Sequence, residues 1–142
     1  MNVKIRNAAA DDAEQLVPLI EMLGHSIDAA GLRERLAYLD DTDIPQIVAV
    51  DDGRVLGLCG LHLMTAIHRP HKVGRITILA VVKDCRGRGI GRSLVQAAED
   101  RLRQCGCQLL EVTSNNRLVD AHNFYLHLGF EQTSKRFGKA LG

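Results

Sequence analysis

Apolar residues recur at two different spacings along the chain, and the spacing separates helices from strands. Four stretches repeat every three to four residues, which places their apolar side chains on one face of a helix. These stretches cover residues 13–23, 32–39, 90–105 and 121–128. Glycines at 24, 106 and 129 stand just after three of them, where helices commonly end. The pattern therefore predicts four helices, the last one short.

Polar residues at the starts of these helices are candidate caps. Asp11, with Glu14 three residues later, is typical of a capping box at the first helix. Asp28 and Asp120 are candidate caps of the second and fourth helices. Pro18 lies inside the first helix and predicts a kink or a break there, because proline lacks a backbone N–H.

Runs rich in β-branched residues, or alternating in polarity, predict strands between these helices. The expected strands cover residues 3–6, 46–50, 55–64, 76–82, 108–113, 130–133 and 137–140. Asp52-Gly53 predicts a tight hairpin turn between the second and third strands. The helix at 90–105 joins two strands, and such a connection makes those strands parallel. We therefore expect an α/β (α+β) fold with a mixed, mostly antiparallel sheet of six or seven strands and helices on both faces.

The most informative stretch is a glycine loop between the strand at 76–82 and the helix at 90–105. Gly87, Gly89 and Gly91 alternate there with Arg86, Arg88, Ile90 and Arg92. Glycines let a ligand approach the backbone, and the first N–H groups of the helix have no intrahelical partner. This loop is suited to a diphosphate. The spacing matches neither a phosphate-binding Walker loop nor the Gly-x-Gly-x-x-Gly dinucleotide fingerprint.

Two blocks together resemble the GCN5-related N-acetyltransferases. The first is Arg86-Gly-Arg-Gly-Ile-Gly91, which matches the Arg/Gln-x-x-Gly-x-Gly/Ala loop of that family. The second covers residues 111–116 and 121–130. With the looser N-terminal half, the resemblance spans nearly the whole chain. It implies that acetyl-CoA is the acetyl donor, and that the two parallel strands splay apart around its pantetheine arm.

The resemblance also implies roles for single residues. The diphosphate of the cofactor would lie against Arg86, Gly87, Arg88, Gly89, Ile90, Gly91 and Arg92. The pantetheine arm would lie against Leu79, Ala80 and Val81, with the Val81 N–H as candidate oxyanion donor. Asn115 is either a cofactor contact or a turn residue. Tyr125 falls on the position of the family's general acid, although its place on the helix stripe also suits a core aromatic residue.

The general base is less defined. Many relatives carry a glutamate on the central strand, but residues 75–79 contain no carboxylate. Glu111 and His62 are the preferred substitutes, and His68 and His71 are alternatives. Histidine suits this role because it titrates near neutral pH.

Composition bounds the remaining possibilities. With 142 residues the chain is expected to form a single acetyltransferase domain, 1–142. The formal net charge of +1 gives no indication of a nucleic-acid or membrane partner. The four cysteines include no Cys-x-x-Cys pair and are expected to be reduced, as in a cytoplasmic protein. The acidic residues 40–43 suggest a solvated loop, or a surface that attracts a cationic amine.

Four stretches point to one subgroup of the family: residues 60–63 (Gly-Leu-His-Leu), the histidine-bearing loop that follows, residues 120–126 (Asp-Ala-His-Asn-Phe-Tyr-Leu) and residues 136–141 (Arg-Phe-Gly-Lys-Ala-Leu). These stretches resemble the aminoalkylphosphonate N-acetyltransferases. Those enzymes use a divalent metal, but this chain has Ile78 where they carry a glutamate, so we expect no metal site. Arg69, Lys72 and Arg75 are candidate contacts for an anionic acceptor, or part of a solvated loop. The expected reaction is acetyl transfer from acetyl-CoA to the primary amine of a small molecule. The alternatives are a protein or peptide N-acetyltransferase and a non-catalytic CoA-binding regulatory protein, and a homodimer is an open possibility.

Overall fold

A computed structural model describes residues 2–116 and 118–142 of the chain. They form two compact units, the first ending at Glu111 and the second beginning at Val112, and each is described by itself. The helices and strands, in chain order, are β1 (Lys4–Asn7), α1 (Ala13–Met22), α2 (Ala29–Thr42), β2 (Ile47–Asp51), β3 (Arg54–Met64), β4 (Val73–Val81), α3 (Ile90–Gln104), β5 (Leu109–Val112) and α4 (Val119–His127). Short 3₁₀ turns precede α1 (Ala10–Asp12) and follow β4 (Lys83–Cys85).

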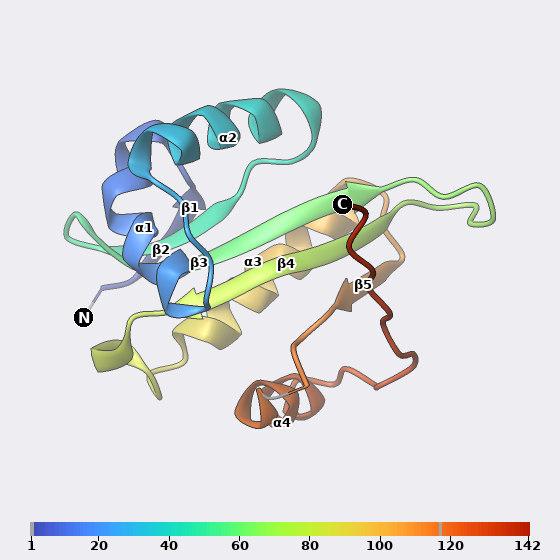
Figure 1. The fold of residues 1–142 in the computed structure, drawn as a ribbon. Helices are drawn as coiled ribbons and strands as arrows, with labels where there is room; N and C mark the ends of the chain where they lie inside the picture. The colour runs from blue at the N-terminus through green and yellow to red at the C-terminus, as the bar shows by residue number, and fades with distance from the viewer. Residues whose placement is uncertain (1, 117) are drawn as a thin grey trace. The chain divides into compact units, whose positions relative to one another are not determined.

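The strands form one sheet in the order β1-β2-β3-β4-β5 (Figure 1). Strands β1 to β4 are antiparallel to their neighbours, and β5 runs parallel to β4. The mixed, mostly antiparallel sheet is therefore confirmed, but the described residues form five strands, not six or seven. The predicted final hairpin at 130–133 and 137–140 is wrong, because every residue from 131 onward is exposed and none is paired in a strand.

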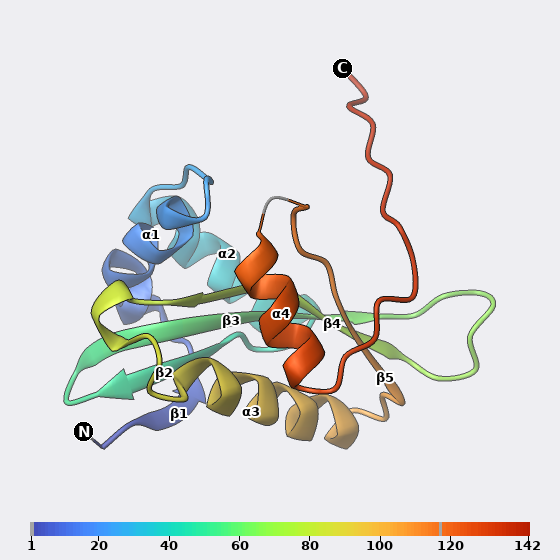
Figure 2. The same ribbon diagram turned by 90° about the horizontal axis from the view of Figure 1, so that it is seen from below.

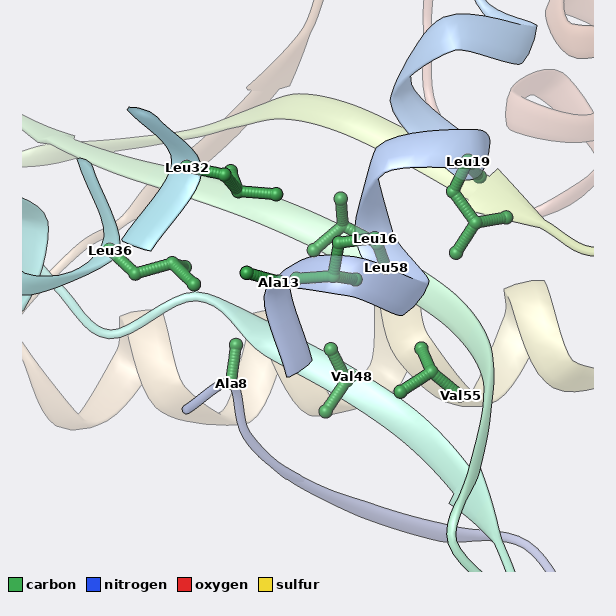
Figure 3. Close-up of a cluster of buried hydrophobic side chains, with 10 residues drawn as sticks. Ala8, Ala13, Leu16, Leu19, Leu32, Leu36, Val48, Val55 and Leu58 are labelled. Carbon is green, nitrogen blue, oxygen red and sulfur yellow. The ribbon is translucent and has the colours of Figure 1, made fainter. Parts of the chain in front are cut away.

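Helices α1 and α2 cover one face of the sheet, and α3 covers the other (Figure 2). On the face covered by α1 and α2, side chains of these helices and of the central strands pack together into a core (Figure 3). Leu16 and Leu36 of the helices, and Val48 and Leu58 of the strands, are buried there. Burying such side chains contributes about 1.5–3 kcal/mol each, so this cluster anchors the two N-terminal helices on the sheet.

Glycines in the sheet let α3 approach the opposite face closely. A Cβ atom added at Gly74 would lie 2.5 Å from Leu102 of α3, and one added at Gly57 would lie 2.9 Å from Leu94. Helix α3 ends at Gly106, which has a φ of 85°. The Cys107 N–H donates to the Leu102 carbonyl at 3.0 Å, which confirms the predicted glycine stop.

The predicted caps are confirmed at only one helix. Asp28 accepts a hydrogen bond from the Gly31 N–H at 2.7 Å at the start of α2. The Asp11–Glu14 capping box is wrong, because Asp12 is buried instead and accepts from the Ala9 N–H at 2.7 Å. Helix α1 runs through Pro18 without a break.

In the second unit, α4 begins one residue before Asp120, so the prediction of Asp120 as its cap is wrong. Gly129 ends α4 with a φ of 93°, as predicted. The Phe130 N–H donates to the Tyr125 carbonyl at 3.1 Å across this turn.

The structure also describes the state of the cysteines and the character of the helices. All four cysteines are free thiols, and only Cys105 is exposed. Burial raises the pKa of the Cys59 thiol to about 12. Among the described helices, none combines the length and the apolar character that a membrane span requires.

Candidate active site

The glycine loop opens α3 in a conformation that leaves backbone donors uncapped. Gly87 and Gly89 have φ of 79° and 81°, in the left-handed region that favours glycine. Gly89 is the N-cap residue of α3, and no described side chain caps the helix there. A Cβ atom added at either glycine would find no neighbour within 4 Å. The N–H groups of the first turn therefore have no capping side chain among the described residues, which leaves them available to a bound anion.

Side chains on either side hold this loop in place. Arg54, at the start of β3, donates two hydrogen bonds to Asp84, at 3.0 and 2.8 Å. This contact lowers the pKa of the Asp84 carboxyl. Arg86 donates back to the Val81 carbonyl at 3.3 Å and lies 3.3 Å from the Met22 sulfur. Arg86 therefore ties the loop to β4 and α1. Residues 86–89 are exposed, whereas Ile90 is buried.

Strand β4 exposes one backbone edge at its C-terminal end. The Val82 N–H donates to the Leu56 carbonyl of β3 at 2.9 Å. Because successive residues of a strand point their N–H groups to opposite sides, the Val81 N–H faces the β5 side, as does that of Leu79. Strand β5 contacts β4 near Arg75, through Glu111, and ends one residue later. On the β3 side, β4 is paired as far as Val81, which lies opposite Gly57. On the other side, β5 has four residues against the nine of β4, so in the described chain it leaves part of that edge without a partner strand.

A bulge shapes the middle of β4. Gly60 lies opposite Ile78 and Leu61 opposite Ile76, so Thr77 is the extra residue. A Cβ atom added at Gly60 would lie 2.5 Å from the Thr77 hydroxyl oxygen. Glycine at position 60 therefore makes room for Thr77, whose side chain is exposed.

Two polar pairs lie beside this bulge on the sheet face that carries α1 and α2. Gly74 faces α3, so its neighbour Arg75 faces the opposite side. His62 lies directly across from Arg75 on β3, and its Nδ1 atom contacts Asp43, just after α2. Arg75 donates to Glu111 at 3.2 Å. The structure therefore brings together His62 and Glu111, two of the three predicted catalytic residues.

Asp43 is a site residue that the sequence did not identify. The acidic run 40–43 is not a uniformly solvated loop, because only 10% of the Asp43 side chain is exposed. Its second oxygen accepts from the Leu63 N–H at 2.7 Å. Nothing in the sequence pairs residue 43 with residue 62, since the contact depends on where α2 ends over the sheet. Among residues 2–116 and 118–142, no group of three or more His, Cys, Asp or Glu side chains is arranged to hold a metal ion.

Two of the predicted site residues, Asn115 and Tyr125, lie in the second unit. Tyr125 of α4 stacks edge-to-face with Phe124 and Phe130, with ring centroids 5.4 and 5.5 Å apart. The Asn115 carbonyl accepts a hydrogen bond from His122 Nε2 at 2.8 Å. Tyr125 is therefore a half-buried member of an aromatic cluster within this unit, and its catalytic role stays a prediction.

Comparison with known proteins identifies the family of this fold and loop. The model of the acetyltransferase (GNAT) family matches residues 13–130, which include both the glycine loop and α4. The chain belongs to the GNAT family. It is therefore an acetyl-CoA-dependent N-acetyltransferase, and acetyl-CoA is its acetyl donor.

Relatives and solved structures agree with this assignment. The chain is 35% identical to an aminoalkylphosphonate N-acetyltransferase of Salmonella typhimurium, over 97% of this chain and 91% of the relative. An acetyltransferase of Trypanosoma brucei has the same fold, with a TM-score of 0.84, 21% identity and coverage of 99% of this chain and 100% of that one. An aminoglycoside N-acetyltransferase in complex with CoA has a TM-score of 0.83 at 20% identity, covering 98% of this chain and 94% of that one.

Proposed function

We propose that this GNAT acetylates the primary amine of a small molecule that also carries an anionic group, with aminoalkylphosphonates as the leading class. The likeness to the Salmonella enzyme over nearly the full length of both chains carries this proposal. Arg75 supports it, because its side chain is one-third exposed on the sheet face beside His62. Only its Nη2 donates to Glu111, and its buried Nε has no partner among the described residues. A phosphonate oxygen suits the remaining guanidinium donors.

The donor half of the reaction is assigned to the glycine loop and β4. The uncapped N–H groups at residues 89–92 would bind the diphosphate of acetyl-CoA, with Arg88 and Arg92 adding charge. Leu79, Ala80 and Val81 would bind the pantetheine arm, and the outward N–H of Val81 would stabilise the oxyanion of the tetrahedral intermediate. Asn115 is a further candidate contact with the cofactor. In the second unit, Tyr125 would protonate the departing thiolate.

A matched amine screen with detection of released thiol tests the acceptor class. Each aminoalkylphosphonate is compared with the alkylamine of the same chain length that lacks the phosphonate, and aminoglycosides and polyamines are included. We expect the phosphonates to have the higher kcat/KM. Arg75→Gln should reduce that preference and leave the alkylamines unaffected. Equal rates for both members of each pair would contradict an anionic acceptor.

A second candidate acceptor is the N-terminus of a protein. It is favoured by a likeness to an N-alpha-acetyltransferase 30 of Schizosaccharomyces pombe, 37% identical over 58% of this chain and 55% of the relative. N-terminal peptides in the same screen decide between the two. Turnover of peptides, without turnover of any small amine, would replace the first proposal by the second.

A further inference from the structure

We propose that Asp43 and His62 form a dyad that takes the proton from the acceptor's ammonium group, with His62 as the base and Asp43 as its positioning residue. This inference rests on the proposed small-molecule acetyltransferase function and names the base of that reaction. It starts from the contact between His62 Nδ1 and an oxygen of Asp43.

Asp43 fixes the histidine ring because both of its oxygens are committed. One oxygen contacts His62 and the other accepts from the Leu63 N–H at 2.7 Å. The carboxylate is thus anchored to the backbone of the residue next to the histidine. Since a carboxylate can only accept, the Nδ1 atom carries the hydrogen and the Nε2 atom is left with its lone pair.

The exposure of the two residues agrees with this division of roles. Asp43 is nearly buried, with 10% of its side chain exposed, whereas 45% of the His62 side chain is exposed. The charged partner is therefore withdrawn from solvent, and the ring is reachable by an acceptor. In contrast, Glu111 is engaged by Arg75, which leaves it less suited to accept a proton.

The position of the dyad on the sheet fits the acceptor half of the reaction. His62 faces the same side as Arg75 and lies three positions along β3 from Cys59, which is opposite Leu79. With the rise of a β-strand, the distance along β3 from Cys59 to His62 is roughly 10 Å. The His62 ring would therefore lie beyond the thioester end of the bound cofactor, away from the diphosphate loop. An amine between the two would give its proton to Nε2 directly or through one water.

The proton and bond changes balance. The ammonium loses one proton to His62 Nε2, and the freed lone pair attacks the thioester carbonyl. The C–N bond forms, the C–S bond breaks, and the thiolate leaves as a thiol with a proton supplied by Tyr125. The second nitrogen proton restores the tyrosine, and His62 releases its proton to solvent.

Two variants test the dyad with an acceptor from the screen. His62→Gln removes the base and should lower kcat/KM by about 10²–10⁴-fold. Asp43→Asn keeps the shape and the bond to the Leu63 N–H, but its amide favours the opposite ring tautomer, and we expect a loss of about 10²-fold or more. Asp41→Asn, an exposed change two residues away, is the matched control and should leave the rate unchanged.

The pH–rate profile separates a catalytic role from a structural one. Asp43, Arg75 and, through Arg75, Glu111 are the charged groups that surround His62, so the profile is compared in Asp43→Asn, Arg75→Gln and Glu111→Gln as well. The acidic limb of kcat/KM should be lost in His62→Gln and altered in Asp43→Asn, and kept in Glu111→Gln. Added imidazole should restore part of the activity of His62→Ala.

The outcomes distinguish this inference from the function on which it rests. If the wild type turns over no small amine, the proposed function fails before the dyad is tested. If the wild type is active, and His62→Gln and Asp43→Asn keep both the rate and the acidic limb, the dyad is wrong. Acetyl-CoA binding of each variant should match the wild type, because neither residue lies in the glycine loop. Melting curves show whether each variant is folded at the assay temperature, so that a loss of rate is not a loss of folded enzyme.

Discussion

At the scale of single residues, Asp12 shows how one buried carboxylate couples stability to pH. Hydrogen bonds from Arg6, at 2.8 Å to each oxygen, and from the Ala9 N–H lower the pKa of Asp12. A lowered pKa in the folded state stabilises the fold above the unfolded-state pKa. That contribution is lost as the pH falls through the folded-state pKa.

Asp12→Asn should therefore destabilise the protein at neutral pH, and the difference from wild type should shrink toward pH 3. We expect a loss of about 1 kcal/mol, since Arg6 is half exposed and its contribution is screened. Urea unfolding at pH 7 and pH 3 measures it, with the exposed Asp11→Asn as control. A difference that stays constant with pH would contradict this account.

Tyr125 offers a test between packing and catalysis. Tyr125→Phe keeps the ring contacts with Phe124 and Phe130 and removes the hydroxyl that the acid role needs. We expect kcat to fall by about 10²–10⁴-fold, while the melting temperature and acetyl-CoA affinity change little. Tyr38→Phe is the matched control, because Tyr38 is the other tyrosine of the chain and is 65% exposed. A fully active Tyr125→Phe enzyme would leave this residue as a packing aromatic.

At the scale of elements, the turn that opens α3 can be compared with the hairpin turn between β2 and β3. Gly89 and Gly53 have nearly the same φ, 81° and 79°, and neither has a neighbour within 4 Å of an added Cβ atom. Gly89→Asp and Gly53→Asp should therefore destabilise the fold by a similar amount, about 1–2 kcal/mol.

Only Gly89→Asp should weaken acetyl-CoA binding, because it places a negative charge at the uncapped end of α3. Isothermal titration of both variants checks this. Equal affinity of Gly89→Asp and Gly53→Asp for acetyl-CoA would contradict the assignment of the diphosphate to this loop.

Elements with strong local patterns could be predicted from the sequence, and those that depend on distant contacts could not. The helix at 90–105 and the Asp52-Gly53 turn follow from periodicity and glycine geometry, and both are confirmed. The final hairpin was predicted from local sequence pattern alone, but a strand needs a partner edge, and residues 131–142 have none in the described chain. The contact of Asp43 with His62 could not be predicted for the same reason, since the two residues are 19 positions apart in the sequence.

At the scale of the whole molecule, cofactor binding should stabilise the folded chain by mass action. Acetyl-CoA at about 100 times its Kd would add about 2.7 kcal/mol, which corresponds to several degrees in the melting temperature. A thermal scan with and without acetyl-CoA measures this, and Gly89→Asp should abolish the shift. An unchanged melting temperature in the wild type at saturating acetyl-CoA would contradict binding by the folded state.

At this scale the mixed sheet could be predicted from the order of strands and helices along the chain. The family could be predicted because its two sequence blocks occur together. The acceptor could not, because the residues proposed to face it come from β3, β4, β5 and the end of α2. Their side chains meet only after the sheet has formed.

The distribution of the cysteines has a practical consequence for these assays. A colorimetric reagent that counts released CoA also reacts with protein thiols, and Cys105 at the end of α3 is the only exposed thiol of the four. The folded enzyme should therefore give a background of one equivalent per chain, which Cys105→Ser would remove. The same side chain lies about 22 Å from the start of α3, by the rise of a 15-residue helix, so a label attached there would leave the glycine loop unoccupied.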